Sequence, residues 1–231
     1  MARLPVEYSF PPLEAASPEG LLAIGGDLNP DRLLSAYRRG IFPWFSQGQP
    51  ILWWSPDPRA ILYPEKIRIS RSLRRSLRSG EFTVTADRAF ASVIAQCAKS
   101  RADQDGTWIT PGMIDAYERL HHLGHAHSIE TWCDDQLVGG LYGIAIGKAF
   151  FGESMFTRVS DASKIALVGL SKILAKADYR FIDCQVRSDH LESLGAESIA
   201  RADFSRALAD AVERPEDAAL WQFEVAAEDL I

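Results

Sequence analysis

The chain has 231 residues, of which 47% are hydrophobic, and a formal net charge of −6 at pH 7. This length allows one large domain or two modest ones with a buried core. No apolar run approaches the roughly 18 residues of a membrane helix, and no signal segment begins the sequence. The negative charge argues against nonspecific coating of nucleic acid, and the three cysteines have neither metal spacing nor an even number. We therefore expect a cytoplasmic protein with reduced thiols and no membrane contact.

Residues 1–62 are expected to form a small N-terminal domain that is rich in aromatic residues and proline. Prolines predict an irregular arm over the first twenty residues. A helix is predicted over 31–39, between an asparagine–proline start and a glycine end. The stiff segment that follows contains tryptophans that are either large core residues or surfaces on which a nucleobase could stack. They are Trp44, Trp53 and Trp54.

A change of composition near residues 60–66 marks the start of a second domain, 63–231. Apolar residues then recur every four positions from Ile69 to Leu77, which predicts a helix capped by Ser70. The surface of this helix is strongly basic, and the segment contains no acidic residue. Such a cluster of arginines either binds phosphate groups or is a solvated helix face. The four arginines are Arg71, Arg74, Arg75 and Arg78.

The second domain then combines strands with helices. Residues 111–123 are predicted to form a helix, because proline and glycine suit its start and another glycine its end. Three successive strands over 128–132, 137–146 and 148–156 predict an antiparallel meander. We therefore predict an α+β fold in which a mainly antiparallel sheet is flanked by helices. The other expected elements are a strand over 82–85, a helix over 87–100, a turn over 105–110, a helix from 161 or 163 to 176, and a strand over 181–186. The last thirty residues are assigned no function.

Two of these strands carry polar side chains within apolar runs: Glu153 in the first, and Asp183 with Gln185 in the second. Burying a carboxylate or an amide in an apolar sheet costs several kcal/mol unless the group is paired or used. Because side chains alternate along a strand, Asp183 and Gln185 should share a face and Cys184 should point away from it. We expect a polar site in the middle of the sheet. Its apolar neighbours would be Phe150, Met155 and Ile182.

Several short segments are distinctive when they are taken together and in order. They are Gly25–Leu28, Gly40–Phe45, Trp53–Arg59, Gly106–Thr110, Leu123–Glu130, Gly152–Phe156 and Ile182–Val186. With these segments the chain closely resembles the bacterial leucyl/phenylalanyl-tRNA–protein transferase family, from about residue 20 to residue 204. The order of helix, three-stranded meander, helix and strand also resembles the acetyltransferase-like (GNAT-like) N-acyltransferase fold.

The resemblance implies a specific reaction. The family takes leucine or phenylalanine from leucyl-tRNA or phenylalanyl-tRNA and attaches it to the N-terminal arginine or lysine of acceptor proteins. The new N-terminus marks the acceptor for degradation by the N-end rule. An aminoacyl ester is already activated, so attack by an α-amine needs positioning, deprotonation and oxyanion stabilisation, but no metal, cofactor or covalent intermediate. We expect a monomer, because nothing in the sequence suggests an obligate interface.

Our hypothesis is that the carbonyl oxygen of Gln185 contacts the attacking amine, Asp183 orients that amide or the acceptor, and Glu153 helps to hold the cationic acceptor end. By resemblance, Trp44 and Trp108 flank the terminal adenosine, and the basic helix contacts tRNA. An apolar pocket should receive the aminoacyl side chain. Matched to the family, this pocket consists of Leu141, Phe150, Met155, Leu170, Leu174 and Ile182. Leucines in it replace larger residues of other members, so the preference between leucine and phenylalanine stays open.

Four other interpretations fit some of these residues. Cys184, with His190 nearby, could be a thiol nucleophile, but a small buried strand residue is the simpler reading. His121, His125 and His127 could bind zinc, but Gly124 breaks the helix between them. An acetyl-coenzyme A enzyme would need a glycine-rich turn before its helix, and residues 158–163 contain no glycine. A noncatalytic tRNA-binding protein would leave the polar strand residues without a role.

Overall fold

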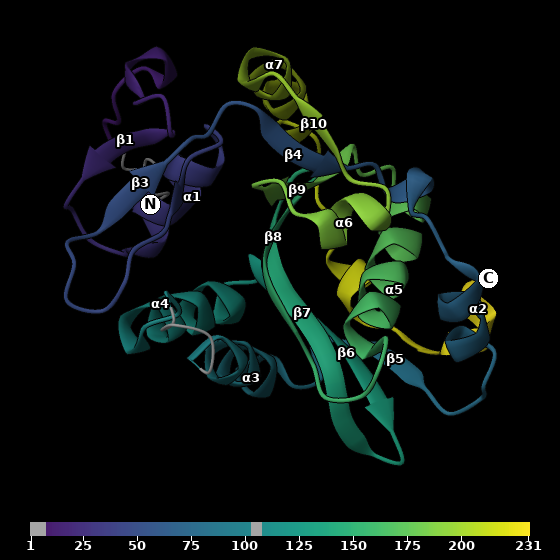
Figure 1. Ribbon diagram of the computed structural model, residues 1–231. Helices are drawn as coiled ribbons and strands as arrows, with labels where there is room; N and C mark the ends of the chain where they lie inside the picture. Colours follow the sequence, from purple (N-terminus) through teal and green to yellow (C-terminus); the bar gives the residue numbers. More distant parts are fainter. Residues whose placement is uncertain (1–7, 103–107) are drawn as a thin grey trace.

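The structure is a computed structural model that describes residues 8–102 and 108–231 (Figure 1). Within these ranges the strands form one three-stranded and one eight-stranded sheet. Residues 105–107 of the expected turn lie outside the described residues, as do residues 1–7 of the expected arm. No helix in the described ranges is long and apolar enough to cross a membrane.

The small sheet is built by the N-terminal part of the chain. Strands β1 (Leu21–Ile24), β3 (Leu52–Trp54) and β2 (Phe42–Pro43) are antiparallel neighbours in that order. Helix α1 (Pro30–Tyr37) begins at Asn29, whose side chain accepts a hydrogen bond from the backbone N–H of Asp31. This confirms the predicted helix, which ends two residues earlier than expected. The 3₁₀ turn η1 (Leu13–Ala15) is the one regular element in the described part of the expected arm.

The large sheet contains the predicted meander. Its strand order is β10-β4-β9-β8-β7-β6-β5-β11, and each neighbouring pair is antiparallel except β8 and β9. The parallel pair arises because the chain crosses over through helix α5 between β8 and β9. The strands span β4 (Arg59–Leu62), β5 (Thr83–Ala86), β6 (Ala126–Cys133), β7 (Gln136–Ile146), β8 (Ala149–Thr157), β9 (Phe181–Gln185), β10 (Glu197–Ile199) and β11 (Glu224–Ala226).

Helices cover both faces of this sheet (Figure 1). Helices α3 (Phe90–Ala102) and α4 (Pro111–His122) pack on one face, and α5 (Ala162–Lys176) packs on the other beside α2 (Arg71–Leu77). Each face therefore has its own hydrophobic core. The arrangement confirms the predicted α+β class with a mainly antiparallel sheet flanked by helices. The remaining elements are α6 (Asp189–Ser193), α7 (Arg201–Val212), and the 3₁₀ turns η2 (Pro64–Lys66), η3 (Ala218–Trp221) and η4 (Ala227–Leu230).

Two parts of the chain extend the large sheet beyond the sequence-based expectation. Strand β4 lies before the expected domain boundary at residue 62, yet it pairs with β9 and β10. The C-terminal segment adds edge strand β11, and the Trp221 ring stacks on His127 with a centroid distance of 3.9 Å. The last thirty residues, to which the sequence assigned no function, therefore complete the sheet and one core.

Candidate active site

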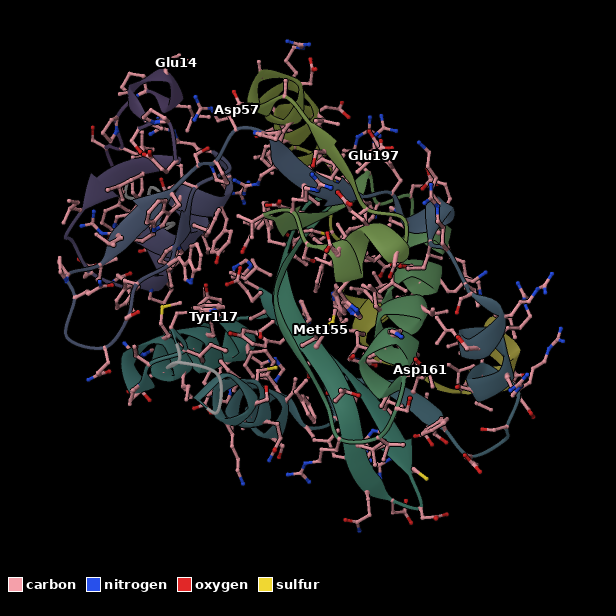
Figure 2. The ribbon with its side chains drawn as sticks, viewed as in Figure 1. Glu14, Asp57, Tyr117, Met155, Asp161 and Glu197 are labelled. Atoms are coloured by element: carbon pink, nitrogen blue, oxygen red, sulfur yellow. The ribbon has the colours of Figure 1, made fainter. Side chains whose placement is uncertain are left out.

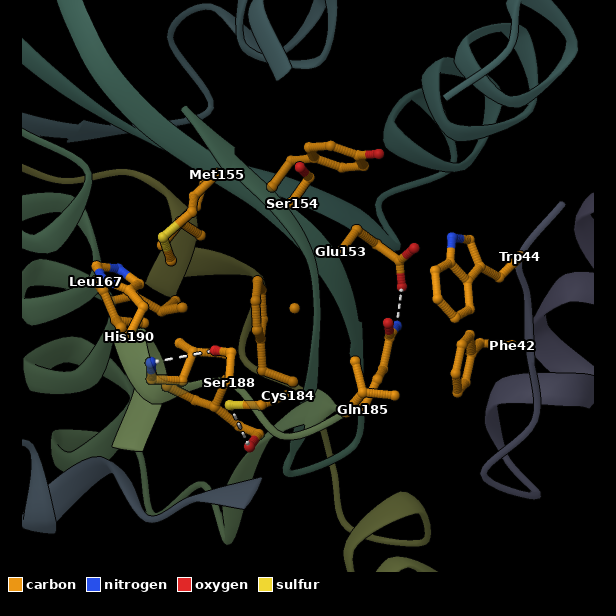
Figure 3. Close-up of a pocket in the computed structure, with 18 of the residues that line it drawn as sticks. Phe42, Trp44, Glu153, Ser154, Met155, Leu167, Cys184, Gln185, Ser188 and His190 are labelled. Carbon is orange, nitrogen blue, oxygen red and sulfur yellow. Dashed lines mark hydrogen bonds between the residues drawn. The ribbon is translucent and has the colours of Figure 1, made fainter. Parts of the chain in front are cut away.

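A cavity of about 310 Å³ lies beside the central strands β7, β8 and β9 (Figure 3). Its walls also include residues of α5 and α6 and the segment 42–44 of the small N-terminal sheet. The volume lies within the usual range for small-molecule sites, about 300–1,000 Å³. Its lining includes Phe42, Trp44, Trp108, Leu141, Tyr142, Phe150, Glu153, Met155, Leu167, Leu170, Ile182, Cys184, Gln185 and His190.

A β-bulge places Glu153 in this cavity. Ser154 lies opposite Tyr142 and Gly152 lies opposite Gly143, so Glu153 is the extra residue without a partner on β7. A bulge interrupts the alternation of side chains along a strand. The plain alternation of a regular strand therefore does not hold along β8. The interruption explains why Phe150 and Met155, five positions apart, both line the cavity.

The Glu153 carboxylate is held by three hydrogen-bond donors. Gln185 Nε2 and the Tyr37 hydroxyl donate to Oε1, each at 2.8 Å, and the Tyr117 hydroxyl donates to Oε2 at 2.9 Å. Tyr37 comes from α1, Tyr117 from α4 and Gln185 from the end of β9, so three separate elements converge on one side chain. Burial raises the pKa of Glu153 to about 7, although the donors act in the opposite direction.

The structure separates the two polar residues of β9. Gln185 lines the cavity, whereas Asp183 is fully buried behind it and does not. Both side chains nevertheless bond to groups on one face of the sheet, as predicted: Asp183 to Arg59 and Gln185 to Glu153, whose own neighbours Phe42, Phe204, Tyr37 and Tyr117 belong to one core. Gln185 has a φ of 63°, in the left-handed region, which ends the regular alternation of the strand. Asp183 Oδ1 accepts a hydrogen bond from the Gln185 backbone N–H at 2.9 Å, so it holds this bend.

Arg59 is the buried partner of Asp183, and the sequence did not reveal it. Its Nε and Nη2 donate to the two carboxylate oxygens at 2.8 and 2.6 Å, and neither side chain is exposed. Its Nη1 donates to the Gly40 carbonyl at 3.0 Å, and its guanidinium lies between the rings of Phe42 and Phe204. A buried ion pair of this kind needs such complete hydrogen bonding to offset desolvation. Arg59 therefore links the small sheet to the strand that carries Gln185.

The opposite end of the cavity is apolar. Five of the six predicted pocket residues line it, which leaves out Leu174. Leu174 is fully buried in the core of α5, one helical turn beyond Leu170. The sequence missed Leu167, which lies one turn before Leu170 and could have been found from helical spacing. The five lining residues are Leu141, Phe150, Met155, Leu170 and Ile182.

Cys184 also lines the cavity, but it packs against the core under α5, on the opposite face of the sheet from the partners of Asp183 and Gln185, as alternation predicts. The cavity reaches residues of both cores, since its lining includes Tyr142 of one core and Leu141 of the other. Burial raises the pKa of the Cys184 thiol, which keeps it protonated at neutral pH. A protonated thiol is a poor nucleophile, so the burial of Cys184 gives no support to the thiol mechanism.

Two of the predicted stacking tryptophans lie at the cavity. Trp44 and Trp108 both line it, and 44% of Trp44 is exposed. Trp54 Nε1 donates to the Trp44 carbonyl at 2.7 Å, which steadies the backbone below that ring. Trp53, in contrast, is buried in the N-terminal core, where its Nε1 donates to the Gly25 carbonyl at 2.9 Å. Trp44 is therefore the exposed aromatic surface at the edge of the cavity.

The four arginines of the basic cluster are exposed on α2 and at its C-terminal end. None of them forms an ion pair with an acidic residue in the described part of the chain. Asp161 connects this helix to α5, since it accepts hydrogen bonds from Ser76 at 2.9 Å and from Lys164 at 2.8 Å. Helix α5 also supplies Leu167 and Leu170 to the cavity, so the basic helix is attached to one of its walls.

Two of the three histidines of the zinc alternative have other partners. His121 Nδ1 lies 2.8 Å from the Ala126 carbonyl, and His127 Nδ1 lies 2.7 Å from Asp87 Oδ2. Among the described residues, no group of three or more histidine, cysteine, aspartate or glutamate side chains is placed to hold a metal ion.

Comparisons with known proteins cover both sheets. The family model described as leucyl/phenylalanyl-tRNA protein transferase matches residues 61–209, and the model of its N-terminal domain matches residues 26–57. The leucyl/phenylalanyl-tRNA–protein transferase of Stutzerimonas stutzeri (strain A1501) is 57% identical over 218 residues, 94% of this chain and 96% of that protein. The protein of the same description from Chromohalobacter salexigens is 59% identical over 215 residues, 92% of this chain and 84% of that protein.

Among solved structures, a GCN5-related N-acetyltransferase from Kribbella flavida aligns with a TM-score of 0.33 at 12% identity, over 72% of this chain and 60% of that chain. A likeness at this level adds nothing to the assignment, which depends on the family models and the sequence relatives. By both of these criteria, the chain belongs to the leucyl/phenylalanyl-tRNA–protein transferase family.

Proposed function

We propose that this chain acts in the cytoplasm as a monomeric aminoacyltransferase. It transfers leucine or phenylalanine from leucyl-tRNA or phenylalanyl-tRNA to the N-terminal arginine or lysine of acceptor proteins, which marks them for degradation. Membership of the family supports the reaction class and the substrate classes. The single observation that carries the proposal is one cavity that combines an apolar end, the hydrogen-bonded pair Glu153–Gln185 and an aromatic edge.

The two ends of the cavity suit the two parts of the donor. The apolar end, between Met155, Leu167 and Leu170, takes the leucine or phenylalanine side chain by hydrophobic burial. The aromatic edge at Trp44 and Trp108 takes the terminal adenosine, because stacking on an aromatic ring contributes about 1–3 kcal/mol per base. The ester carbonyl then lies between the two ends, beside Gln185. Figure 3 displays this order, with Trp44 on one side of Gln185 and Met155 on the other.

Gln185 is oriented for the acceptor amine. Its Nε2 donates to Glu153, which leaves its carbonyl oxygen Oε1 to accept a hydrogen bond from the α-amino group. Asp183 does not reach the cavity, and its role is to hold the backbone of Gln185. An α-amino group has a pKa of about 8, so a weak acceptor suffices to free its lone pair near neutral pH. Peptide-bond formation then follows from positioning of the amine against the activated ester.

The basic helix supports binding of the tRNA body. Its four exposed arginines carry no carboxylate partner among the described residues and are therefore available for phosphate groups. Asp161 joins their helix, α2, to α5, and α5 supplies residues to one wall of the cavity. The same tRNA can thus contact the arginines while its aminoacyl end occupies the cavity.

Mass spectrometry of a peptide with N-terminal arginine, incubated with this protein and leucyl-tRNA, tests the proposal. We expect a gain of one leucyl residue, absent from a peptide that begins with alanine and absent when coenzyme A thioesters replace tRNA. In Asp183→Ala and Gln185→Ala variants, turnover should fall far more than tRNA affinity. Bound tRNA without any product would contradict the transferase assignment and favour a noncatalytic tRNA-binding protein.

A further inference from the structure

The oxygen atoms around Glu153 form a ring that has more contacts than protons. The Tyr37 and Tyr117 hydroxyls lie 2.5 Å apart, and each also lies within 2.9 Å of one Glu153 oxygen. Three oxygen–oxygen contacts therefore need three protons, and the two phenols supply two. Gln185 Nε2 donates to Oε1 from outside the ring, so its proton serves a separate contact. With Glu153 ionised, the ring lacks one proton.

One proton on the carboxyl group completes the ring. Glu153 Oε2 then donates to Tyr117, Tyr117 donates to Tyr37, and Tyr37 donates to Glu153 Oε1. Both tyrosines are fully buried and Glu153 is 6% exposed, which makes an incomplete ring costly. Protonation therefore restores one contact of the ring, whereas ionisation strengthens the hydrogen bonds that the two phenols donate to the carboxylate.

The other ionisable groups near Glu153 are neutral tyrosines and the ion pair of Asp183 with Arg59. Burial raises the pKa of both phenols well above 10, so Tyr37 on α1 and Tyr117 on α4 stay neutral. From β7, Tyr142 presents its ring to Tyr117 at a centroid distance of 5.7 Å. From β9, the charge of Asp183 raises the pKa of Glu153, and Arg59 of β4 pairs with Asp183. Burial remains the largest influence, and Glu153 is the group of this ring that titrates near neutral pH.

We propose that Glu153 takes the proton that the α-ammonium group of the acceptor protein must lose. Tyr37 and Tyr117 are positioning residues that hold the Glu153 carboxyl group for this step. This inference rests on the proposed transferase function. An N–H bond of the ammonium breaks and an O–H bond forms on Glu153. The freed nitrogen lone pair forms the new C–N bond, the ester C–O bond breaks, and the departing 3′-oxygen takes a second proton from the same nitrogen. The third proton stays on the amide nitrogen, and Glu153 later releases its proton to solvent.

The proposal gives the small N-terminal domain a part in the chemistry. Tyr37 is the last residue of α1, whereas Tyr117 belongs to α4. Figure 2 marks Tyr117 on α4, across from Met155 on the central sheet. The ring forms only when α1, α4 and β8 are packed together, so the N-terminal domain supplies one of its three members.

NMR titration of the side-chain carboxyl groups, in protein labelled with ¹³C-glutamate, tests the ring without any substrate. The Glu153 signal is assigned by its loss in a Glu153→Gln variant. We expect it to titrate near pH 7 and to move up by about one pH unit in Tyr37→Phe and in Tyr117→Phe. The upward direction follows because each phenol lowers the pKa of Glu153 by donating to its carboxylate, and this charge-assisted hydrogen bond is stronger than the neutral Tyr37–Tyr117 contact that protonation restores. Tyr179→Phe is the matched control, since that phenol is also buried but lies outside the ring.

Single-turnover transfer rates from pH 6 to 9 then test the proton step. The titration of the peptide amine is common to all variants, so the ratio of variant to wild-type rate isolates Glu153. This ratio should rise with pH for Tyr37→Phe and Tyr117→Phe, and fall with pH for Glu153→Gln, which has no group to ionise. Rate ratios that do not change with pH would overturn the proposal. So would a Glu153 signal that titrates near the ordinary carboxyl value of 4.5, or one whose pKa is the same in wild type, Tyr37→Phe and Tyr117→Phe. The NMR result does not depend on transfer, so failure of the transferase assignment is distinguishable from failure of the ring.

Discussion

The buried carboxyl of Glu153 makes the stability of this protein depend on pH in a direction that can be calculated. Burial raises its pKa from an ordinary value of 4.5 to about 7. Below pH 4.5 the carboxyl is protonated in both the folded and the unfolded chain. As pH rises, the unfolded chain loses this proton first, so stability is lost until the folded pKa is passed. Above the folded pKa, the free energy of unfolding is lower by the full penalty of ionising the buried carboxyl, which is about 3 kcal/mol from the difference between the folded and unfolded pKa values.

A Glu153→Gln variant removes this pH dependence. The carboxamide resembles the protonated carboxyl, because it has one acceptor oxygen and a nitrogen that can donate to a phenol. We expect the variant to gain stability relative to wild type as pH rises from 5 to 8, by about 2–3 kcal/mol. Urea unfolding followed by tryptophan fluorescence at both pH values measures this difference. The expected sign is unusual for a substitution in a candidate active site, since the variant becomes more stable and less active.

A surface substitution provides the control for this measurement. Glu14 is exposed on η1 and does not line the cavity, Figure 2 shows it well away from Met155, and Glu14→Gln makes the same chemical change. It should alter the free energy of unfolding by no more than about 0.5 kcal/mol at either pH. If Glu153→Gln changed stability equally at pH 5 and pH 8, the reasoning about the buried carboxyl would be refuted.

Three further predictions concern other parts of the chain. Arg59→Met should lower the free energy of unfolding by about 3–5 kcal/mol, because it leaves Asp183 buried without its partner. Arg180→Met breaks a half-exposed ion pair with Asp210 and should lower the free energy of unfolding by less than about 1 kcal/mol. Urea unfolding measures both variants, and equal shifts of the midpoint in Arg59→Met and Arg180→Met would contradict this contrast. Changing Arg71 and Arg75 to glutamine should weaken tRNA binding and reduce the slope of log affinity against log salt by about 0.7–0.9 for each lost phosphate contact, measured by filter binding. An unchanged slope would show that these arginines do not contact phosphate. Leu170→Ala and Leu174→Ala should each destabilise the fold by about 2–5 kcal/mol, yet Leu170→Ala alone should alter the ratio of leucine to phenylalanine transferred in competition. The same change of ratio in both variants would place the side-chain pocket elsewhere.

Local periodicity in the sequence determined most of the secondary structure. Alternating apolar residues predicted the meander of β6, β7 and β8, and helical spacing with a serine cap predicted α2 with its four exposed arginines. The polar residues within apolar strands identified Glu153 and Gln185, and both line the cavity. These inferences were within reach because they depend on residues close in the chain, where spacing alone decides which side chains share a surface.

The tertiary structure alone decided how those residues are held. Arg59 and Asp183 are 124 positions apart, and Tyr37 and Glu153 are 116 apart, so no local pattern could pair them. The bulge at Glu153 also interrupted the alternation of side chains along β8. Periodicity describes a regular strand, whereas a buried charge is stable only where distant elements supply donors to it. The sequence therefore determined which groups need partners, and the packing of α1, α4 and β4 against the central sheet decided which partners they have.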